Sequence, residues 1–174
     1  TSILFYAGTQ EAGTTTSNVN GNWQMTVTLA TGTHSLTAKA VDALGNTSAA
    51  SAALLVTVDV TAPAQPAILA FKDEYTTGGN NGFSRGNVLK LSGSAELGAT
   101  VKVTLSAASQ TKETVATSGA WEVDFSDLAL ADGTYTFEAT ATDVAGNVSQ
   151  LSASFTLTID RVAPAAPVVA SISE

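Results

Sequence analysis

The sequence predicts an all-β fold built from tandem antiparallel β-sandwiches, and three observations lead to this expectation. Apolar and polar residues alternate with a period of two over several short segments, which is the pattern of strands with one buried and one solvated face. Gly, Asn, Asp and Ser fill the gaps between these segments, as expected for tight turns. The sequence also repeats itself at a spacing of 101 residues, from Gly32 to Gly133.

The repeat divides the chain into modules. Segments 32–36, 42–46 and 59–63 return at 133–137, 143–147 and 160–164, whereas Gly21-Asn22-Trp23 matches Gly119-Ala120-Trp121 three residues out of phase. We therefore expect residues 63–163 to form a complete module, residues 1–62 to be the C-terminal part of another (strands C to G), and residues 164–174 to start a third. Strands A and B are missing from the first module, and we expect upstream residues or a second chain to supply them.

The complete module contains about seven short segments of strand character. They lie near residues 66–71, 88–93, 101–106, 111–117, 121–125, 135–142 and 151–159, and are named A to G. Seven alternating strands in about 100 residues indicate an immunoglobulin-like (Ig-like) sandwich, with no helix longer than about two turns. The side chains expected in its core are Trp121, Val123, Phe125, Phe137, Phe155 and Leu157.

The charge and composition exclude several classes of partner. The 174 residues carry a formal net charge of −8, which disfavours nucleic acids and anionic membrane surfaces and favours divalent cations. Because there is no cysteine, neither a disulfide scaffold nor thiol chemistry is available. No apolar run approaches the length of a membrane span, so we expect no direct membrane insertion.

No group of residues predicts catalysis, and we expect that the chain is not an enzyme. His34 is the only histidine and aligns with Tyr135, so we expect it to pack in the core or at its boundary. Asp73 and Glu74 form a carboxylate pair but fall on a polar segment that we expect to be solvated. The sequence contains neither a nucleophile elbow nor a phosphate-binding loop.

Acidic residues are expected to gather at one pole of the complete module. Seven strands of alternating direction place the B–C loop, with Glu96, and the F–G loop, with Asp143, at the same pole, where the linker brings Asp59. Three carboxylates at close range repel one another unless a cation binds, and an all-oxygen ligand set favours Ca²⁺. The alternative is that these aspartates form turns by accepting hydrogen bonds from the backbone two residues on.

Several motifs resemble one known family. They are the segment Leu91–Val101, the Gly-x-Trp pairs, Asp132-Gly133-Thr134-Tyr135, the segment Ala141–Asn147 and the Asp-x-x-Ala-Pro linkers. Together these motifs resemble the bacterial Ig-like tandem repeats of giant Gram-negative surface and biofilm adhesins. The resemblance covers essentially the whole chain.

The resemblance implies a row of extracellular modules that projects a distal adhesive domain from the cell surface, with calcium at the junctions. It implies ligands at Asp59 or Asp160, at Asp42 or Asp143, and at Glu96. One departure is Arg161 beside Asp160, where the family usually has a small neutral residue.

Two other functions stay open beside a structural spacer. A module that itself binds a glycan or a receptor would expose aromatic side chains, and Tyr75 and Phe83 are the candidates in the complete module. The other alternative function is that of an accessory domain of a secreted glycoside hydrolase. The expected partners of the spacer are the neighbouring modules of the same chain and calcium ions.

Overall fold

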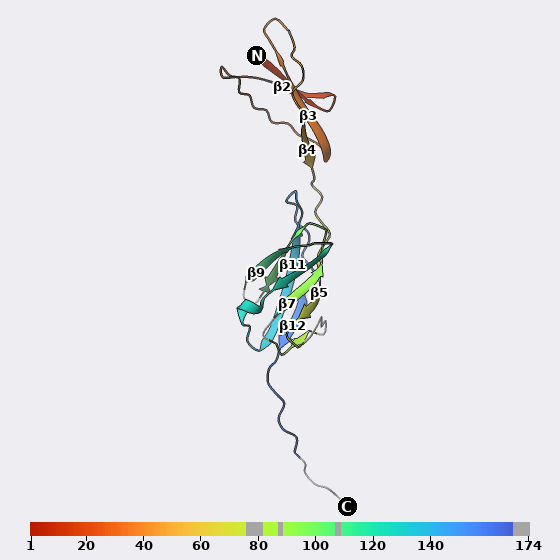
Figure 1. The fold of residues 1–174 in the computed structure, drawn as a ribbon, viewed down its shortest axis with the longest axis vertical. Helices are drawn as coiled ribbons and strands as arrows, with labels where there is room; N and C mark the ends of the chain where they lie inside the picture. The colour runs from red at the N-terminus through yellow and green to blue at the C-terminus, as the bar shows by residue number, and fades with distance from the viewer. Residues whose placement is uncertain (76–81, 87–88, 107–108, 169–174) are drawn as a thin grey trace, which may run out of the picture. The chain divides into compact units, whose positions relative to one another are not determined.

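The computed structural model describes residues 1–75, 82–86, 89–106 and 109–168, in which strands and loops predominate (Figure 1). The all-β antiparallel fold class predicted from the sequence is confirmed. Helical structure in the described ranges is confined to short 3₁₀ turns such as η2 (Ser126–Leu128), and no helix there is long and apolar enough to cross a membrane. The chain divides into two compact units, Thr1–Thr61 and Ala62–Glu174.

The second unit contains two sheets. The three-stranded sheet has the order β10-β7-β5 and comprises β5 (Ala67–Lys72), β7 (Lys90–Ser94) and β10 (Ala120–Asp124). The five-stranded sheet has the order β6-β12-β11-β8-β9 and comprises β6 (Phe83–Ser84), β8 (Thr100–Leu105), β9 (Gln110–Val115), β11 (Gly133–Thr142) and β12 (Phe155–Ile159). All neighbours are antiparallel except the short β6, which runs parallel to β12. Strands A to G correspond to β5, β7, β8, β9, β10, β11 and β12.

The apolar faces of these two sheets form one core. Its largest fully buried side chains include Phe71, Leu91, Val101, Val103, Leu105, Phe125, Phe137 and Leu157. The rings of Phe125 and Phe137 meet edge to face with centroids 5.3 Å apart, a favourable geometry for aromatic pairs. Of the predicted core residues, Trp121, Val123, Phe125, Phe137 and Leu157 are buried, and Phe155 is partly buried against them.

The prediction that the alternation of strand G begins at Leu151 is wrong. Strand β12 begins at Phe155, and Leu151 is 48% exposed. The hydroxyls of Ser149 and Ser152 each accept a hydrogen bond of 2.9 Å from a backbone N–H of β11. Because serine hydroxyls take the place of backbone carbonyls here, Ser149 and Ser152 face inwards and Leu151 faces solvent.

The first unit contains a single sheet of order β2-β1-β3-β4. Its strands are β1 (Ser2–Ala7), β2 (Gln10–Thr16), β3 (Gly32–Val41) and β4 (Leu54–Val58). In the repeat they correspond to β8, β9, β11 and β12, strands C, D, F and G. Residues 23–27, which align with strand E at 121–125, are not a strand. In the second unit that strand, β10, pairs with β7, and the first unit contains no counterpart of β7.

Candidate metal site

The two Asp-x-x-Gly-Asn turns have the same backbone geometry. In the second unit the N–H of Asp143 donates to the carbonyl of Asn147 (3.1 Å), and the N–H of Gly146 donates to the carbonyl of Asp143 (3.2 Å). Gly146 and its counterpart Gly45 have φ values of 92° and 88°, a left-handed conformation that glycine adopts without steric cost. Each turn follows the last residue of a strand, so the repeat motif fixes where its aspartate lies.

The carboxylates of these turns accept hydrogen bonds from their own loop. Oδ1 of Asp143 accepts from the N–H groups of Ala145 (2.8 Å) and Asn147 (2.9 Å), and Oδ2 accepts from Nδ2 of Asn147 (2.9 Å). Asp42 makes the equivalent contacts with Leu44 and Asn46. Both aspartates therefore form turns, as the alternative interpretation expected.

These hydrogen bonds also lower the pKa of both aspartates. The side-chain amide of Asn147 and the turn N–H groups hold the pKa of Asp143 below its usual value, and Asn46 lowers the pKa of Asp42 in the same way. Hydrogen bonds to a carboxylate favour its charged form. Each turn thus presents a fixed negative charge at neutral pH.

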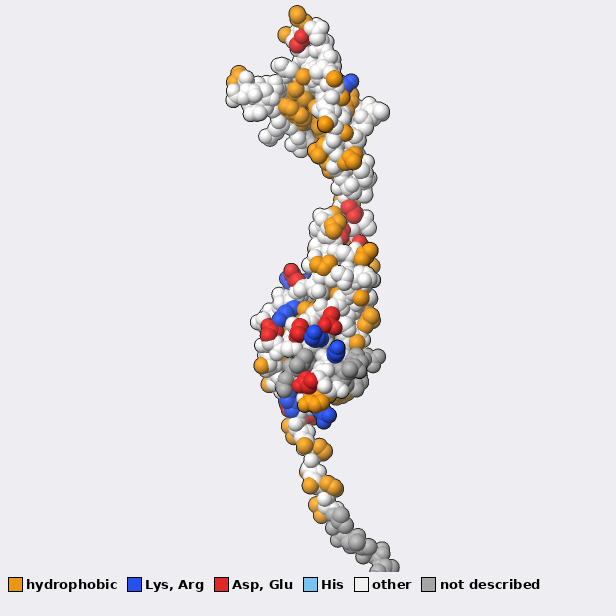
Figure 2. All heavy atoms as spheres, in the orientation of Figure 1, with side chains coloured by type: hydrophobic (Ala, Val, Ile, Leu, Met, Phe, Trp, Pro, Cys, Tyr) orange, Lys and Arg blue, Asp and Glu red, His pale blue; other side chains and the backbone are white. Residues whose placement is uncertain are grey.

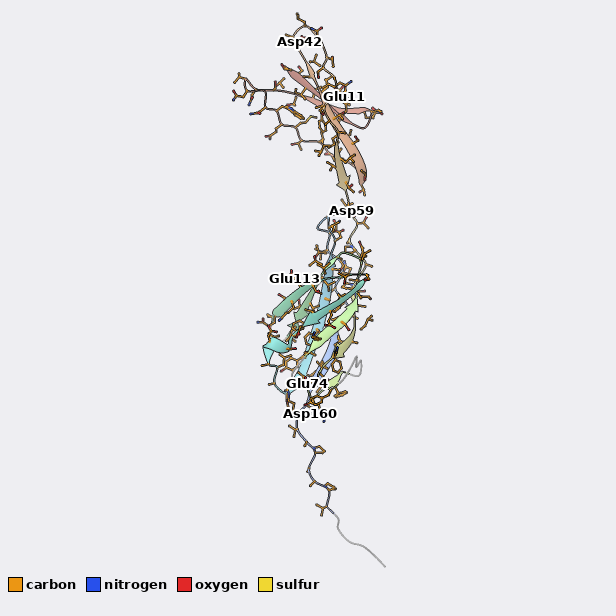
Figure 3. The ribbon with its side chains drawn as sticks, in the orientation of Figure 1. Glu11, Asp42, Asp59, Glu74, Glu113 and Asp160 are labelled. Carbon is orange, nitrogen blue, oxygen red and sulfur yellow. The ribbon has the colours of Figure 1, made fainter. Side chains whose placement is uncertain are left out.

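The linker aspartates adopt a second local pattern. Oδ1 of Asp59 accepts from the N–H of Thr61, and Oδ1 of Asp160 accepts from the N–H of Val162, at 2.9 Å each. Such bonds to the residue two positions on are Asx turns. Both residues are labelled in Figure 3, where Asp160 and Glu74 lie at the same end of the second unit.

Glu96 and Asp143 belong to loops at one end of the second unit. The B–C loop ends where β8 begins at Thr100, and the Asp143 turn starts where β11 ends at Thr142; these two threonines are paired. Within the described residues, no group of three acidic or histidine side chains is arranged to hold a metal ion. Asp59 belongs to the first unit, and a cluster of Asp59, Glu96 and Asp143 stays a prediction.

Arg161 makes contacts that the sequence patterns did not predict. Its Nη1 donates to Oδ1 of Asp132 (2.8 Å), while Nη2 donates to the carbonyls of Gly86 (2.9 Å) and Leu130 (3.1 Å). The backbone N–H and the guanidinium of Arg161 together hold the pKa of Asp132 below its usual value. The start of the second linker is thereby fastened to the second unit.

A comparison of the two copies could have revealed this pair. The first copy has Thr31 where the second has Asp132, and Val60 where the second has Arg161. The second copy thus gains an acidic residue at one position and a basic residue at the other. Such a paired change indicates a contact if both positions lie at the same end of the fold.

The expectation of a solvated Asp73-Glu74 pair is wrong for Asp73. Asp73 is buried, Ser84 donates a hydrogen bond to its carboxylate, and the N–H of Tyr75 donates to Oδ1 (2.8 Å). A buried carboxylate is retained where such donors satisfy it. Glu74 is exposed, as expected.

The candidate aromatic residues are both exposed. Tyr75 and Phe83 have 60% and 64% of their surface accessible to solvent. The guanidinium of Arg85 lies over the ring of Tyr75, 4.3 Å from its centroid, a distance typical of a cation–π contact. These residues belong to the segment between β5 and β7.

His34 lies at the start of β3 and contacts the loop before it. Its Nε2 lies 2.7 Å from the carbonyl of Ala30, and the hydroxyl of Tyr135 donates to the equivalent carbonyl of Ala131 (2.9 Å). Both side chains are partly buried at the start of the equivalent strands β3 and β11. The histidine thus ties a strand to the preceding loop, in agreement with a packing role at the core boundary.

Comparison with known proteins identifies one family. The family model described as bacterial Ig-like domain matches the chain twice, at residues 1–60 and 61–161. No protein with a curated description matches the chain.

Among solved structures, the chain is similar to fibronectin(III)-like modules of Clostridium thermocellum CbhA, with 16% identity and a TM-score of 0.51 over 97% of this chain and 83% of that one. It also matches the BSP domain of a biofilm associated protein, with 17% identity and a TM-score of 0.41 over 93% of this chain and 25% of that one. A Ca²⁺-stabilized adhesin that helps an Antarctic bacterium bind ice matches with 24% identity and a TM-score of 0.39, over 91% and 40% of the two chains. The chain therefore spans between a quarter and four-fifths of these structures.

Proposed function

The chain belongs to the bacterial Ig-like domain family, and we propose that it is a spacer within a longer adhesin on the bacterial surface. In this role the modules carry no chemistry of their own and set the distance between the cell and a distal adhesive domain. The observation that carries the proposal is the tandem arrangement: the family model matches the chain twice in direct succession, at 1–60 and 61–161.

The anchored linker residues support a stiff spacer. Pro63 and Pro66 are buried in the second unit, and Nε2 of Gln65 donates to the carbonyl of Leu151. Proline fixes its own φ angle and restricts the residue before it to extended geometry. Under this proposal few linker residues would be free to bend, as a spacer under load requires.

We further propose that calcium stiffens the junctions. At the first junction the ligands would be Asp59, Glu96 and Asp143, and Asp42 and Asp160 would play the corresponding parts at the flanking junctions. The pairing of Thr100 with Thr142 supports this proposal, because it brings the loops of Glu96 and Asp143 to the same end of the second unit. Extracellular modules bind Ca²⁺ with Kd values of about 10⁻⁴–10⁻³ M, so binding would require extracellular calcium concentrations.

Small-angle scattering and thermal unfolding of the 174-residue chain, each in calcium and in EGTA, test this function. We expect the maximum dimension and the unfolding midpoint to be higher in calcium, since a ligand that binds only the folded junction stabilises it by about 2.7 kcal/mol at one hundred times Kd. Asp143→Ala should remove the response to calcium.

The matched control is Glu113→Ala, which removes an exposed carboxylate of β9. It should respond to calcium as the unmodified chain does. If calcium changes neither quantity in any sample, the acidic residues serve as turn formers only, and the prolines alone hold the spacer straight.

A second candidate function rests on Tyr75 and Phe83. Exposed aromatic rings can stack on sugar rings, and Arg85 already lies against Tyr75. A glycan-binding module would lose affinity for an arrayed glycan on Tyr75→Ala. If no glycan binds the unmodified chain, this second function is excluded for the glycans tested.

A further inference from the structure

The first and last strands of the second unit belong to different sheets. The chain enters the unit through β5, at the edge of the three-stranded sheet, and leaves it through β12, in the five-stranded sheet. Figure 1 shows that it enters at one end of the unit and leaves at the other. Tension between these ends therefore pulls β5 and β12 in opposite directions. The core between the sheets resists such sliding only weakly, because the hydrophobic effect is non-directional.

Strand β6 connects the exit strand with the segment that follows the entry strand. By sequence β6 lies between β5 and β7, yet it pairs with β12 in the other sheet. The N–H of Thr158 donates to the carbonyl of Gly82 (2.7 Å). The N–H of Asp160 donates to the carbonyl of Ser84 (2.9 Å). Since β6 runs parallel to β12, pulling β12 along its own axis loads both hydrogen bonds sideways and at the same time.

A buried side-chain contact ties β6 to the end of β5. Asp73 directly follows the last residue of β5, and the hydroxyl of Ser84 donates a hydrogen bond to its carboxylate. The same hydroxyl accepts from the N–H of Gly86 (3.0 Å). Because Asp73 and Ser84 are both buried, separating them would leave polar groups without a partner, which is costly. Hydrogen bonds thus join β5 to β12 through β6.

Arg161 makes a second connection just beyond the end of β12. Its guanidinium donates to the carbonyl of Gly86, in the segment between β5 and β7. It also donates to the carbonyl of Leu130 and the carboxylate of Asp132, just before β11. Figure 2 shows charged side chains of both signs at the end of the unit where the chain leaves it. One side chain therefore holds the exit of the chain against two segments.

We propose that the β6–β12 pair, the Asp73–Ser84 contact and the Arg161–Asp132 ion pair form a clasp that bears the load when the second unit is pulled between its ends. The proposal rests on the proposed spacer function only for the source of the tension, and it does not involve calcium. The first copy has Val60 in place of Arg161, so the two copies of the repeat differ in one part of this clasp.

Optical tweezers test the proposal on the 174-residue chain in EGTA. The chain lacks cysteine, so pairs of cysteines introduced at exposed positions can carry the DNA handles. Ala62→Cys with Ala165→Cys, both at exposed positions, pulls the second unit between its ends. Ala62→Cys with Glu122→Cys, also exposed, pulls β5 against β10. In this second geometry the load crosses β7 within one sheet and does not reach β12.

Two sets of substitutions weaken the clasp. Asp132→Thr with Arg161→Val gives the second copy the residues of the first, and Ser84→Ala removes the hydroxyl that contacts Asp73. Pulled between its ends at constant tension, each variant should unfold about tenfold faster or more than the unmodified chain. Pulled through Glu122→Cys, each should unfold at the unmodified rate. The double variant leaves the buried contact intact, so it decides the test if Ser84→Ala does not fold.

The matched control is Asp127→Ala, which removes a different ion pair of the same unit, between Asp127 and Lys112 (2.6 Å). Pulled between its ends, this variant should unfold at the unmodified rate. An unchanged rate for the double variant would overturn the proposal. Equal acceleration in both geometries would also overturn it, because the contacts would then stabilise the fold without bearing load. The scattering test of the spacer function depends on calcium, so the two proposals can fail separately.

Discussion

The four strands that the two units share form in both, whereas the residues after the tryptophan become a strand only in the second unit. In the first unit β1 to β4 pair with the same neighbours as β8, β9, β11 and β12 do in the second. Residues 24–30 remain irregular, although the Gly-x-Trp motif precedes them. The comparison teaches that strands C, D, F and G pair with one another in both units. Strand E forms only in the unit where strand B is present to pair with it.

Burial differs between the units in the same way. The second unit closes a core between two sheets, and the first leaves one face of its only sheet open. Since hydrophobic stabilisation scales with the apolar area removed from water, equivalent substitutions should cost far more in the second unit.

The tryptophan pair should show the largest contrast. Trp121→Ala should destabilise the second unit by about 3–5 kcal/mol, as expected for a buried ring replaced by alanine. Trp23→Ala should change the stability of the first unit by less than about 1 kcal/mol, because that ring is already 39% exposed. Native-state hydrogen exchange, measured separately for β11 and β3, gives the change in the free energy of unfolding for each unit. Equal losses of stability in the two units would contradict the difference in burial.

The linker contact should give the next largest effect. Arg161→Ala removes the two hydrogen bonds to the carbonyls of Gly86 and Leu130, and should cost about 1–2 kcal/mol. The control is Val60→Ala, which changes the equivalent residue of the first linker, an exposed one, and should be nearly neutral. Urea unfolding measures both effects, in the second unit for Arg161→Ala and in the first unit for Val60→Ala.

The same contact predicts a pH dependence. The folded-state pKa of Asp132 is lowered by Arg161, so its contribution to stability is fully present above the unfolded-state pKa and is lost as the pH falls through the folded-state pKa. Arg161→Ala removes the guanidinium but keeps the backbone N–H that donates to Asp132, so it should flatten the acid limb of the stability curve of the second unit only in part. An acid limb that is unchanged in Arg161→Ala would show that the ion pair contributes nothing.

Tyr135→Phe should have a smaller effect. It deletes the hydroxyl that donates to Ala131 and should cost about 0.5–1.5 kcal/mol. His34→Tyr should preserve the equivalent contact with Ala30 and leave the first unit unchanged within error. If His34→Tyr lowers the stability of the first unit as much as Tyr135→Phe lowers that of the second, the contacts with Ala30 and Ala131 are not equivalent.

The sequence predicted the strands of the complete module because one face of each is apolar and turn residues separate them. The prediction from the sequence was wrong where a side chain, and not the backbone, makes the hydrogen bond. Ser149 and Ser152 take over pairing with β11, and thereby turn Leu151 outwards. Asp73 is buried because Ser84, eleven residues away, satisfies it, and no local pattern encodes that contact.

In the candidate site, too, local motifs predicted some features, and contacts between distant residues determined the others. The turn roles of Asp42 and Asp143 follow from the five-residue motif alone, and the structure shows them in both units. The pair of Arg161 and Asp132 spans 29 residues and required the topology of the sheets. A calcium cluster that includes Asp59 draws on two units, so neither local pattern nor single-module topology determines it.

The distance between the two units tests the calcium-stiffened spacer most directly. The chain lacks cysteine, so Gln10→Cys and Glu113→Cys, both at exposed positions, allow one spin label in each unit for electron paramagnetic resonance. We predict a narrow distribution of distances in millimolar calcium, a broad one in EGTA, and a broad one in both for the Asp59→Ala variant. Distributions of equal width in calcium and EGTA would contradict the account.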